Sequence, residues 1–140
     1  MVIETHGVPD LVVNNAGIGV FGTFLDHTAD DWDRQLGVNL GGVIHGCRVF
    51  AGPMVERGQG GEIVNIASVA AYMPCRAAPA YCVSKAGVTM LSDCLRIELS
   101  GEGLGVPAIC PGLINPNIAR AAGLLCCDKF YPMLNGPPRG

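Results

Sequence analysis

Three short apolar runs, separated by two long helical stretches, constrain the fold of this chain most strongly. Residues 11–14, 62–68 and 106–110 have the apolar, β-branched character of buried strands. Residues 30–57 and 79–100 predict helices, of which the first breaks near Gly41 and Gly42. Alternating strands and helices predict parallel strands joined by right-handed crossovers. We therefore expect an α/β fold with 62–68 as the central strand of three and with long flanking helices.

Composition narrows the possible functions. Of the 140 residues, 49% are hydrophobic and 15% are charged, and the net charge is −3, which predicts one soluble domain and no nucleic-acid surface. The sequence shows no secretion signal and no apolar run long enough to cross a membrane. Seven cysteines without metal-ligand spacing suit small core residues in a reducing cytoplasm. We expect a cytoplasmic protein without a metal site.

Tyr81 and Lys85 are the strongest candidates for chemistry. They are four residues apart in a predicted helix, so they share one face. An ammonium beside a phenol lowers the tyrosine pKa, which suits a general acid or base near neutral pH. Ser68 ends the second strand-like run, thirteen residues before Tyr81, and its hydroxyl could orient a carbonyl or an alcohol. The same tyrosine and lysine spacing also occurs in ordinary surface or core pairs.

Five motifs in one order distinguish these readings. They are Asn-Asn-Ala-Gly at residues 14–17, Asn39, Ser68, Tyr-x-x-x-Lys at residues 81–85, and Pro-Gly at residues 111–112. Over residues 8–120 this series resembles the short-chain dehydrogenase/reductase family. The resemblance implies a Rossmann-like, doubly wound parallel sheet, of which the three runs would be three of seven strands. It also implies hydride transfer between NAD or NADP and a small alcohol or carbonyl substrate.

The resemblance assigns roles to individual residues. Tyr81 would donate or accept the proton, and Ser68 would position the reacting oxygen. Lys85 would lower the pKa of Tyr81 and bind the nicotinamide ribose hydroxyls. Asn39 would hold a water that links Lys85 to solvent. The cofactor cleft would be lined by two of the catalytic residues and by residues from both ends of the motif series. These residues are Asn14, Ala16, Gly17, Tyr81, Lys85, Pro111 and Gly112.

Two departures from the family pattern concern the cofactor. No Gly-x-x-x-Gly-x-Gly turn, which would hold a pyrophosphate at a helix N-terminus, precedes Asn14. We therefore expect an N-terminally truncated domain with only the nicotinamide half-site, and no residue that selects NAD or NADP. Pro116 stands where the family usually has a threonine, and proline has neither hydroxyl nor N–H.

Two function classes follow from this pattern. The first is an NAD(P)-dependent oxidoreductase, and the second is a catalytically inactive remnant that cannot bind the dinucleotide alone. Residues 1–120 are interpreted as the C-terminal portion of the Rossmann domain, and residues 121–140 as an irregular tail. We expect residues 11–14 to be an uncovered edge strand, and the two long helices to present apolar outer stripes. Both features predict a homo-oligomer or an aggregation-prone chain.

Overall fold

The computed structural model describes residues 2–112 of the chain. Its longer elements are two helical segments and a central strand, as the sequence predicts. In chain order the elements are α1 (Val2–His6), β1 (Leu11–Asn14), α2 (Ala29–Leu36), η1 (Gly37–Gly41), α3 (Gly42–Arg57), β2 (Gly61–Ile66), η2 (Val69–Ala71), α4 (Pro79–Glu98), η3 (Ser100–Glu102), β3 (Leu104–Gly105) and β4 (Ala108–Ile109). Pro116 and the interpreted tail at residues 121–140 lie outside the described residues.

The described sheet is parallel throughout, with β2 at its centre. β1 pairs with one edge of β2, and Asn14 lies opposite Asn65 in that register. β3 and β4 pair with the other edge. The third strand, expected at residues 106–110, is instead two short pieces on either side of Pro107, β3 beginning earlier than expected, since Pro107 has no N–H to donate to a ladder. Its carbonyl still accepts from the Asn65 N–H at 3.0 Å, so the chain stays against β2. The expected strand order is confirmed.

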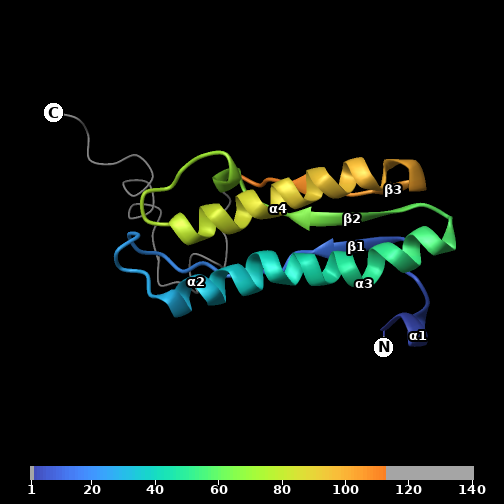
Figure 1. The fold of residues 1–140 in the computed structure, drawn as a ribbon, viewed down its shortest axis with the longest axis horizontal. Coiled ribbons are helices and arrows are strands. Elements are labelled where there is room, and N and C mark those ends of the chain that lie inside the picture. Colours follow the sequence, from blue (N-terminus) through green and yellow to red (C-terminus); the bar gives the residue numbers. More distant parts are fainter. Residues whose placement is uncertain (1, 113–140) are drawn as a thin grey trace.

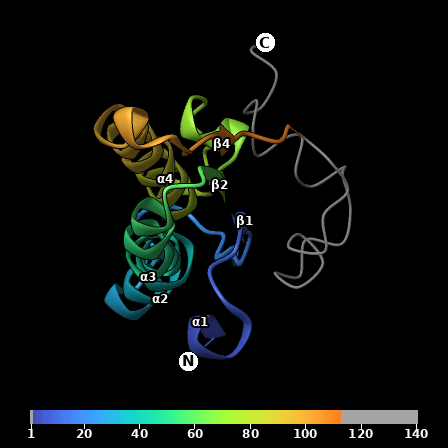
Figure 2. The same cartoon turned by 90° about the vertical axis from the view of Figure 1, so that its right-hand side faces the viewer.

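Both long helices lie on the same face of the described sheet (Figure 2). Figure 1 shows α2 and α3 as one rod that runs alongside α4, with β1 and β2 visible between the two in this view. The strand order explains this arrangement, because two right-handed crossovers that step in one direction place their helices on one side. On the opposite face Leu11, Val13 and Ile109 remain 56%, 52% and 49% exposed within the described residues.

Local sequence signals set the ends of the first rod. Thr28 caps α2 in a capping box, in which its hydroxyl accepts from the Asp31 N–H and the Asp31 carboxylate accepts from the Thr28 N–H. The break expected near Gly41 and Gly42 is a π-helical turn, η1, rather than an end of the helix. α3 then continues to Arg57, and Gly58 ends it with φ of 66°, which glycine adopts without strain.

The core between the helices and the sheet changes character along the strands. Near the amino ends of the strands it is apolar, with Met54, Ile63, Leu104 and Val106 at most 3% exposed. In the middle, the buried Asn65 amide accepts from Asn14 Nδ2 at 2.8 Å and donates to Ser92 Oγ at 2.9 Å, so its polar atoms are satisfied. Toward the carboxyl ends polar side chains dominate.

Candidate active site

Ser68 and Tyr81 approach each other beyond the carboxyl end of β2. Ser68 lies two residues after β2, where its hydroxyl accepts from the Ala70 N–H at 3.2 Å and caps the short helix η2. Tyr81 is half-buried in the first turn of α4. The Ser68 hydroxyl acts on the Tyr81 phenol and lowers its pKa. This contribution indicates that the Ser68 hydroxyl lies within reach of the Tyr81 phenol, whereas the catalytic roles of both residues stay a prediction.

Lys85 lies one helical turn after Tyr81 and is almost completely buried, with 4% exposure. Its ammonium donates to the backbone carbonyl of Ile66 at 2.8 Å and lies 5.8 Å from the centroid of the Tyr81 ring. Burial lowers the pKa of Lys85. No carboxylate of the described residues pairs with this ammonium, and two of its three N–H groups have no protein acceptor there.

The pKa of Tyr81 is raised, whereas the sequence led us to expect a lowered value. Burial of the phenol is the largest cause, the Ser68 hydroxyl opposes it, and the thiols of Cys82 and Cys75 add to the rise. Lys85 does not reverse this, because its ammonium is held at the Ile66 carbonyl. Burial thus favours the proton-bearing form of the Tyr81 phenol over the phenolate.

Asn39 lies in the π turn and is fully buried. Its amide accepts from the Ile18 N–H at 2.8 Å, and donates to the Ile18 carbonyl at 3.0 Å and to Ser84 Oγ at 3.1 Å. A π turn inside a helix often marks a functional position. The water relay that the sequence assigned to Asn39 stays a prediction.

Gln35 was not found from the sequence, although it is fully buried one turn before Asn39. Its Oε1 accepts from the Val20 N–H at 2.7 Å, and its Nε2 donates to the Ile18 carbonyl at 2.8 Å. The two amides together fix the segment that follows β1. A glutamine on the inner face of an amphipathic helix was the available signal.

Gly17 brings this segment against the site. A Cβ on Gly17 would lie 3.5 Å from Asn39 Oδ1 and 3.6 Å from Lys85 Nζ, so these two side chains are close to each other as expected. Ala16 and Gly17 are exposed, which leaves an open edge beside the lysine. Further along, Phe21 places its ring centroid 6.2 Å from that of Tyr81.

The remaining predicted cofactor residues, Asn14, Pro111 and Gly112, differ in their contacts and in their exposure to solvent. The Asn14 side chain turns toward α3 and is engaged with Asn65, so any cofactor role would rest on its backbone. The Pro111 carbonyl accepts from the Val69 N–H at 3.0 Å, next to Ser68. Gly112 is exposed and ends the described part of the chain.

Neither a metal-binding cluster nor a membrane-spanning helix is present among the described residues. No group of three or more histidine, cysteine, aspartate or glutamate side chains among them could hold a metal ion. None of the helices in this part of the chain is long and apolar enough to span a membrane.

Comparison with known proteins identifies oxidoreductases among the relatives of this chain. The probable oxidoreductase EphD of Mycobacterium tuberculosis is 58% identical over 118 residues, which are 84% of this chain and 20% of that protein. Meso-2,3-butanediol dehydrogenase of Serratia marcescens is 35% identical over 129 residues, which are 92% of this chain and 51% of that protein. The chain therefore spans a fifth to a half of these relatives.

Solved structures of dehydrogenases are also similar to this chain. A gluconate 5-dehydrogenase from Burkholderia cenocepacia, in complex with NADP and tartrate, superimposes with a TM-score of 0.85 and 29% identity, over 94% of this chain and 50% of that one. A short chain dehydrogenase/reductase from Burkholderia phymatum, in complex with NAD, superimposes with a TM-score of 0.83 and 29% identity. The match covers 99% of this chain and 56% of that one. The family described as short chain dehydrogenase matches residues 1–123. This chain belongs to the short-chain dehydrogenase/reductase family.

Proposed function

We propose that this chain carries the catalytic part of an NAD(P)-dependent oxidoreductase that acts on an alcohol or carbonyl group. One observation carries the proposal: a phenol, a serine hydroxyl and a buried ammonium meet beyond the carboxyl end of β2. Open α/β sheets bind their ligands at this end. The relative named for a butanediol supports an alcohol as the reduced substrate.

In this proposal each side chain acts on one atom. Tyr81 donates its proton to the carbonyl oxygen during reduction, and takes it back from the alcohol during oxidation. Ser68 holds that oxygen next to the phenol. Asn39 fixes the backbone beside Lys85 and, through a water, connects the lysine to solvent. When bound, the nicotinamide dinucleotide supplies or accepts the hydride.

The residues present fit the nicotinamide end of such a cofactor. The two N–H groups of Lys85 without a protein acceptor suit neighbouring ribose hydroxyls, and exposed Gly17 leaves the approach to them open. Ala16, Pro111 and Gly112 would border the same cleft. We propose that the described residues form this half-site.

If the chain were a catalytically inactive remnant, it would have no use for the polar groups of this site. The arrangement does not favour it, because a buried lysine with one carbonyl acceptor is costly for a fold to keep without a use. NAD or NADP preference would depend on residues near the adenosine ribose.

Replacement of single phenols tests the proposed activity. In the full chain, Tyr81→Phe should reduce NAD(P)H-dependent turnover of carbonyl substrates by about 10²- to 10⁴-fold, the usual contribution of a general acid. Tyr72→Phe, in a tyrosine that is 69% exposed, is the matched control and should retain activity. Equal turnover by the two variants, or none in the native chain with either dinucleotide, would count against the proposal.

We also propose that the chain forms homo-oligomers in a reducing, cytoplasmic setting. Val83, Met90 and Ile97 recur every seven residues along α4 and are 50%, 64% and 71% exposed. Such a stripe suits a second helix. Sedimentation of the native chain should show a species larger than the monomer, and Met90→Glu should reduce it. Leu25→Glu, which changes an exposed leucine outside the stripe, should not.

A further inference from the structure

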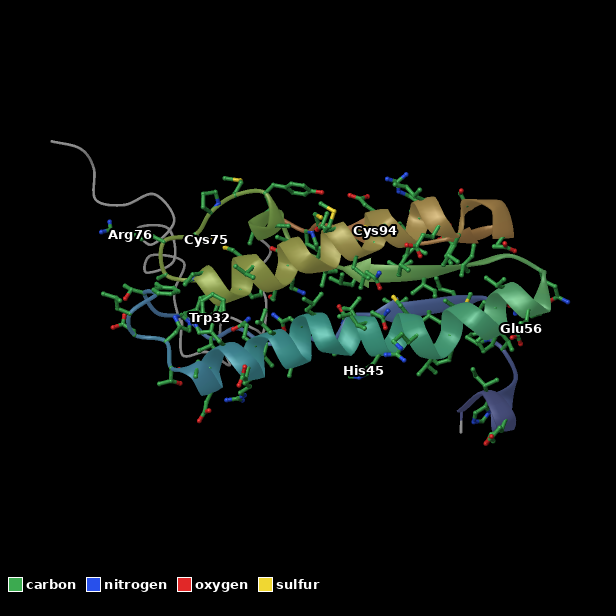
Figure 3. The ribbon with its side chains drawn as sticks, viewed as in Figure 1. Trp32, His45, Glu56, Cys75, Arg76 and Cys94 are labelled. Atoms are coloured by element: carbon green, nitrogen blue, oxygen red, sulfur yellow. The ribbon has the colours of Figure 1, made fainter. Side chains whose placement is uncertain are left out.

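Two thiols meet at the junction between α4 and the loop that precedes it. Cys75 lies in that loop, and Cys82 lies in the first turns of the helix (Figure 3 labels Cys75 beside the start of α4). The Met73 carbonyl accepts from both thiols, at 3.5 Å from Cys75 Sγ and 3.9 Å from Cys82 Sγ. A shared acceptor keeps the two sulfur atoms in one small volume. Both cysteines are free and half-buried, so a small reagent can reach them.

The backbone holds the pair in this position. The Cys75 carbonyl accepts from the Ala78 N–H at 3.3 Å, and the Ala78 carbonyl accepts from the Cys82 N–H at 3.0 Å. These consecutive turns place both side chains on the same side of the junction. The thiols also affect each other, since burial and then the Cys82 thiol raise the pKa of Cys75 to about 11. A disulfide needs Cβ atoms about 4 Å apart, so the bridge requires that the two thiols, which already share an acceptor and affect each other, come together across this junction.

We propose that Cys75 and Cys82 form a redox-active pair, which a small-molecule disulfide converts into an intramolecular disulfide. The Cys82 thiolate attacks one sulfur of the reagent, whose S–S bond breaks and releases the first thiolate. The Cys75 thiolate then attacks Cys82 Sγ in the mixed disulfide and releases the second thiolate. Two protein thiols are oxidised, the reagent disulfide is reduced to two thiols, and the protons of the protein thiols pass to the released thiolates or to solvent.

The order of the two attacks follows from the surroundings of Cys75. Its raised pKa leaves little thiolate, so Cys75 is the weaker first attacker. Once Cys82 is in the mixed disulfide it carries no charge, and one of the causes of that raised pKa is removed. Attack within the chain then has the advantage of proximity over a second reagent molecule.

The position of the bridge gives it a structural consequence. Tyr81 immediately precedes Cys82, and both thiols contribute to the raised pKa of Tyr81. A disulfide cannot ionise, so oxidation would remove those two contributions. It would also tie the loop at residues 72–78 to the helix that carries Tyr81. This inference does not depend on the proposed oxidoreductase activity, because the pair is defined by its own geometry.

Peptide mapping tests the pair directly. The full chain is incubated with oxidised glutathione, the remaining thiols are blocked with iodoacetamide, and the protein is digested with trypsin without reductant. Cleavage after Arg57, Arg76 and Lys85 separates the cysteines, since residues 58–76 contain Cys75 and residues 77–85 contain Cys82. The expected product is these two peptides joined by one disulfide, as the dominant cross-link.

Variants and unfolding provide the controls. The joined peptides should vanish in Cys75→Ser and in Cys82→Ser, and should persist in Cys94→Ser, whose thiol is exposed elsewhere on α4. Circular dichroism must show that all three variants fold. In urea the disulfide between Cys75 and Cys82 should no longer be the dominant cross-link, since the turns that pair the thiols are unfolded. Glutathione on each cysteine without a bridge, a bridge to another cysteine, or the same yield in urea would overturn the proposal.

Discussion

Gly46 is the position where the packing makes the sharpest prediction about stability. It lies inside α3 where the helix crosses β1. A Cβ placed on it would overlap Asn14 Oδ1, and would lie 2.8 Å from Asn14 Cγ and 3.0 Å from Nδ2. The Asn14 side chain has little freedom to move, because its amide donates to the buried Asn65 at 2.8 Å. Gly46→Ala must therefore displace a hydrogen-bonded side chain or push the helix off the strand.

The change in the free energy of unfolding follows from one stabilising and two destabilising contributions. Alanine favours the helix over glycine by about 1 kcal/mol. Overpacking of a tight contact costs about 1–3 kcal/mol, and loss of the amide hydrogen bond in a buried setting costs about 1–3 kcal/mol more. Gly46→Ala should thus lower the free energy of unfolding by about 1–5 kcal/mol. At Gly42, on the same helix, a Cβ meets nothing within 4 Å, so Gly42→Ala should raise it by about 0.5–1 kcal/mol.

Urea unfolding, followed by circular dichroism and by the fluorescence of Trp32, measures both changes. A third variant isolates the cause: Asn14→Ala combined with Gly46→Ala should lose less than the sum of the single changes, because the overlap is relieved. If the stability losses of the two single changes simply add, the cost of Gly46→Ala does not arise from its contact with Asn14. If Gly46→Ala is as stable as Gly42→Ala, the described approach of α3 to β1 is wrong.

Three further changes probe the buried polar groups. Gln35→Leu leaves the Val20 N–H without its acceptor, and should cost about 1–3 kcal/mol by urea unfolding, whereas no change would mean that the loop is held otherwise. Asn65→Leu should cost at least as much, and Ser92→Ala added to it should cost little more, because the two share a hydrogen bond. For Lys85, the lowered pKa means that folding is penalised while the ammonium is charged. The native chain should therefore gain stability relative to Lys85→Met as the pH rises from 7 toward the ordinary lysine pKa of about 10.4, and a pH-independent difference would refute this.

The order and direction of the elements could be predicted because they depend on local patterns. Apolar runs of strand length, long helical stretches between them and the glycines after Arg57 are all visible within a few residues. The division of the third strand depends on Pro107, which the sequence shows but whose effect requires the register with β2. The expected break near Gly41 became a π turn, because the helix resumes where α3 packs against the sheet.

The site was predicted less completely, for a physical reason. Ser68, Tyr81 and Lys85 were recognised because their order and spacing are distinctive. Gln35 and the pair of Asn14 with Asn65 were not, because their partners lie 15 or more residues away in the chain. Whether a buried amide is satisfied is decided by the tertiary structure. The pKa of Tyr81 was misjudged for the same reason, since burial by residues distant in sequence outweighs the nearby lysine.

The distribution of polarity along the core connects stability with the proposed function. At the amino ends of the strands, Met54 and Leu104 belong to an apolar cluster whose burial stabilises the domain. At the carboxyl ends, Asn39, Ser84 and Lys85 occupy buried positions where apolar side chains would pack without a desolvation penalty. Asn39 and Ser84 satisfy each other at 3.1 Å, but Lys85 has a single carbonyl acceptor within the described residues. Within the described residues, the domain thus carries a costly buried ammonium at the end of the sheet where ligands bind in this fold class. That cost is explained if the lysine has a second set of acceptors in the working protein, and two ribose hydroxyls would meet this requirement.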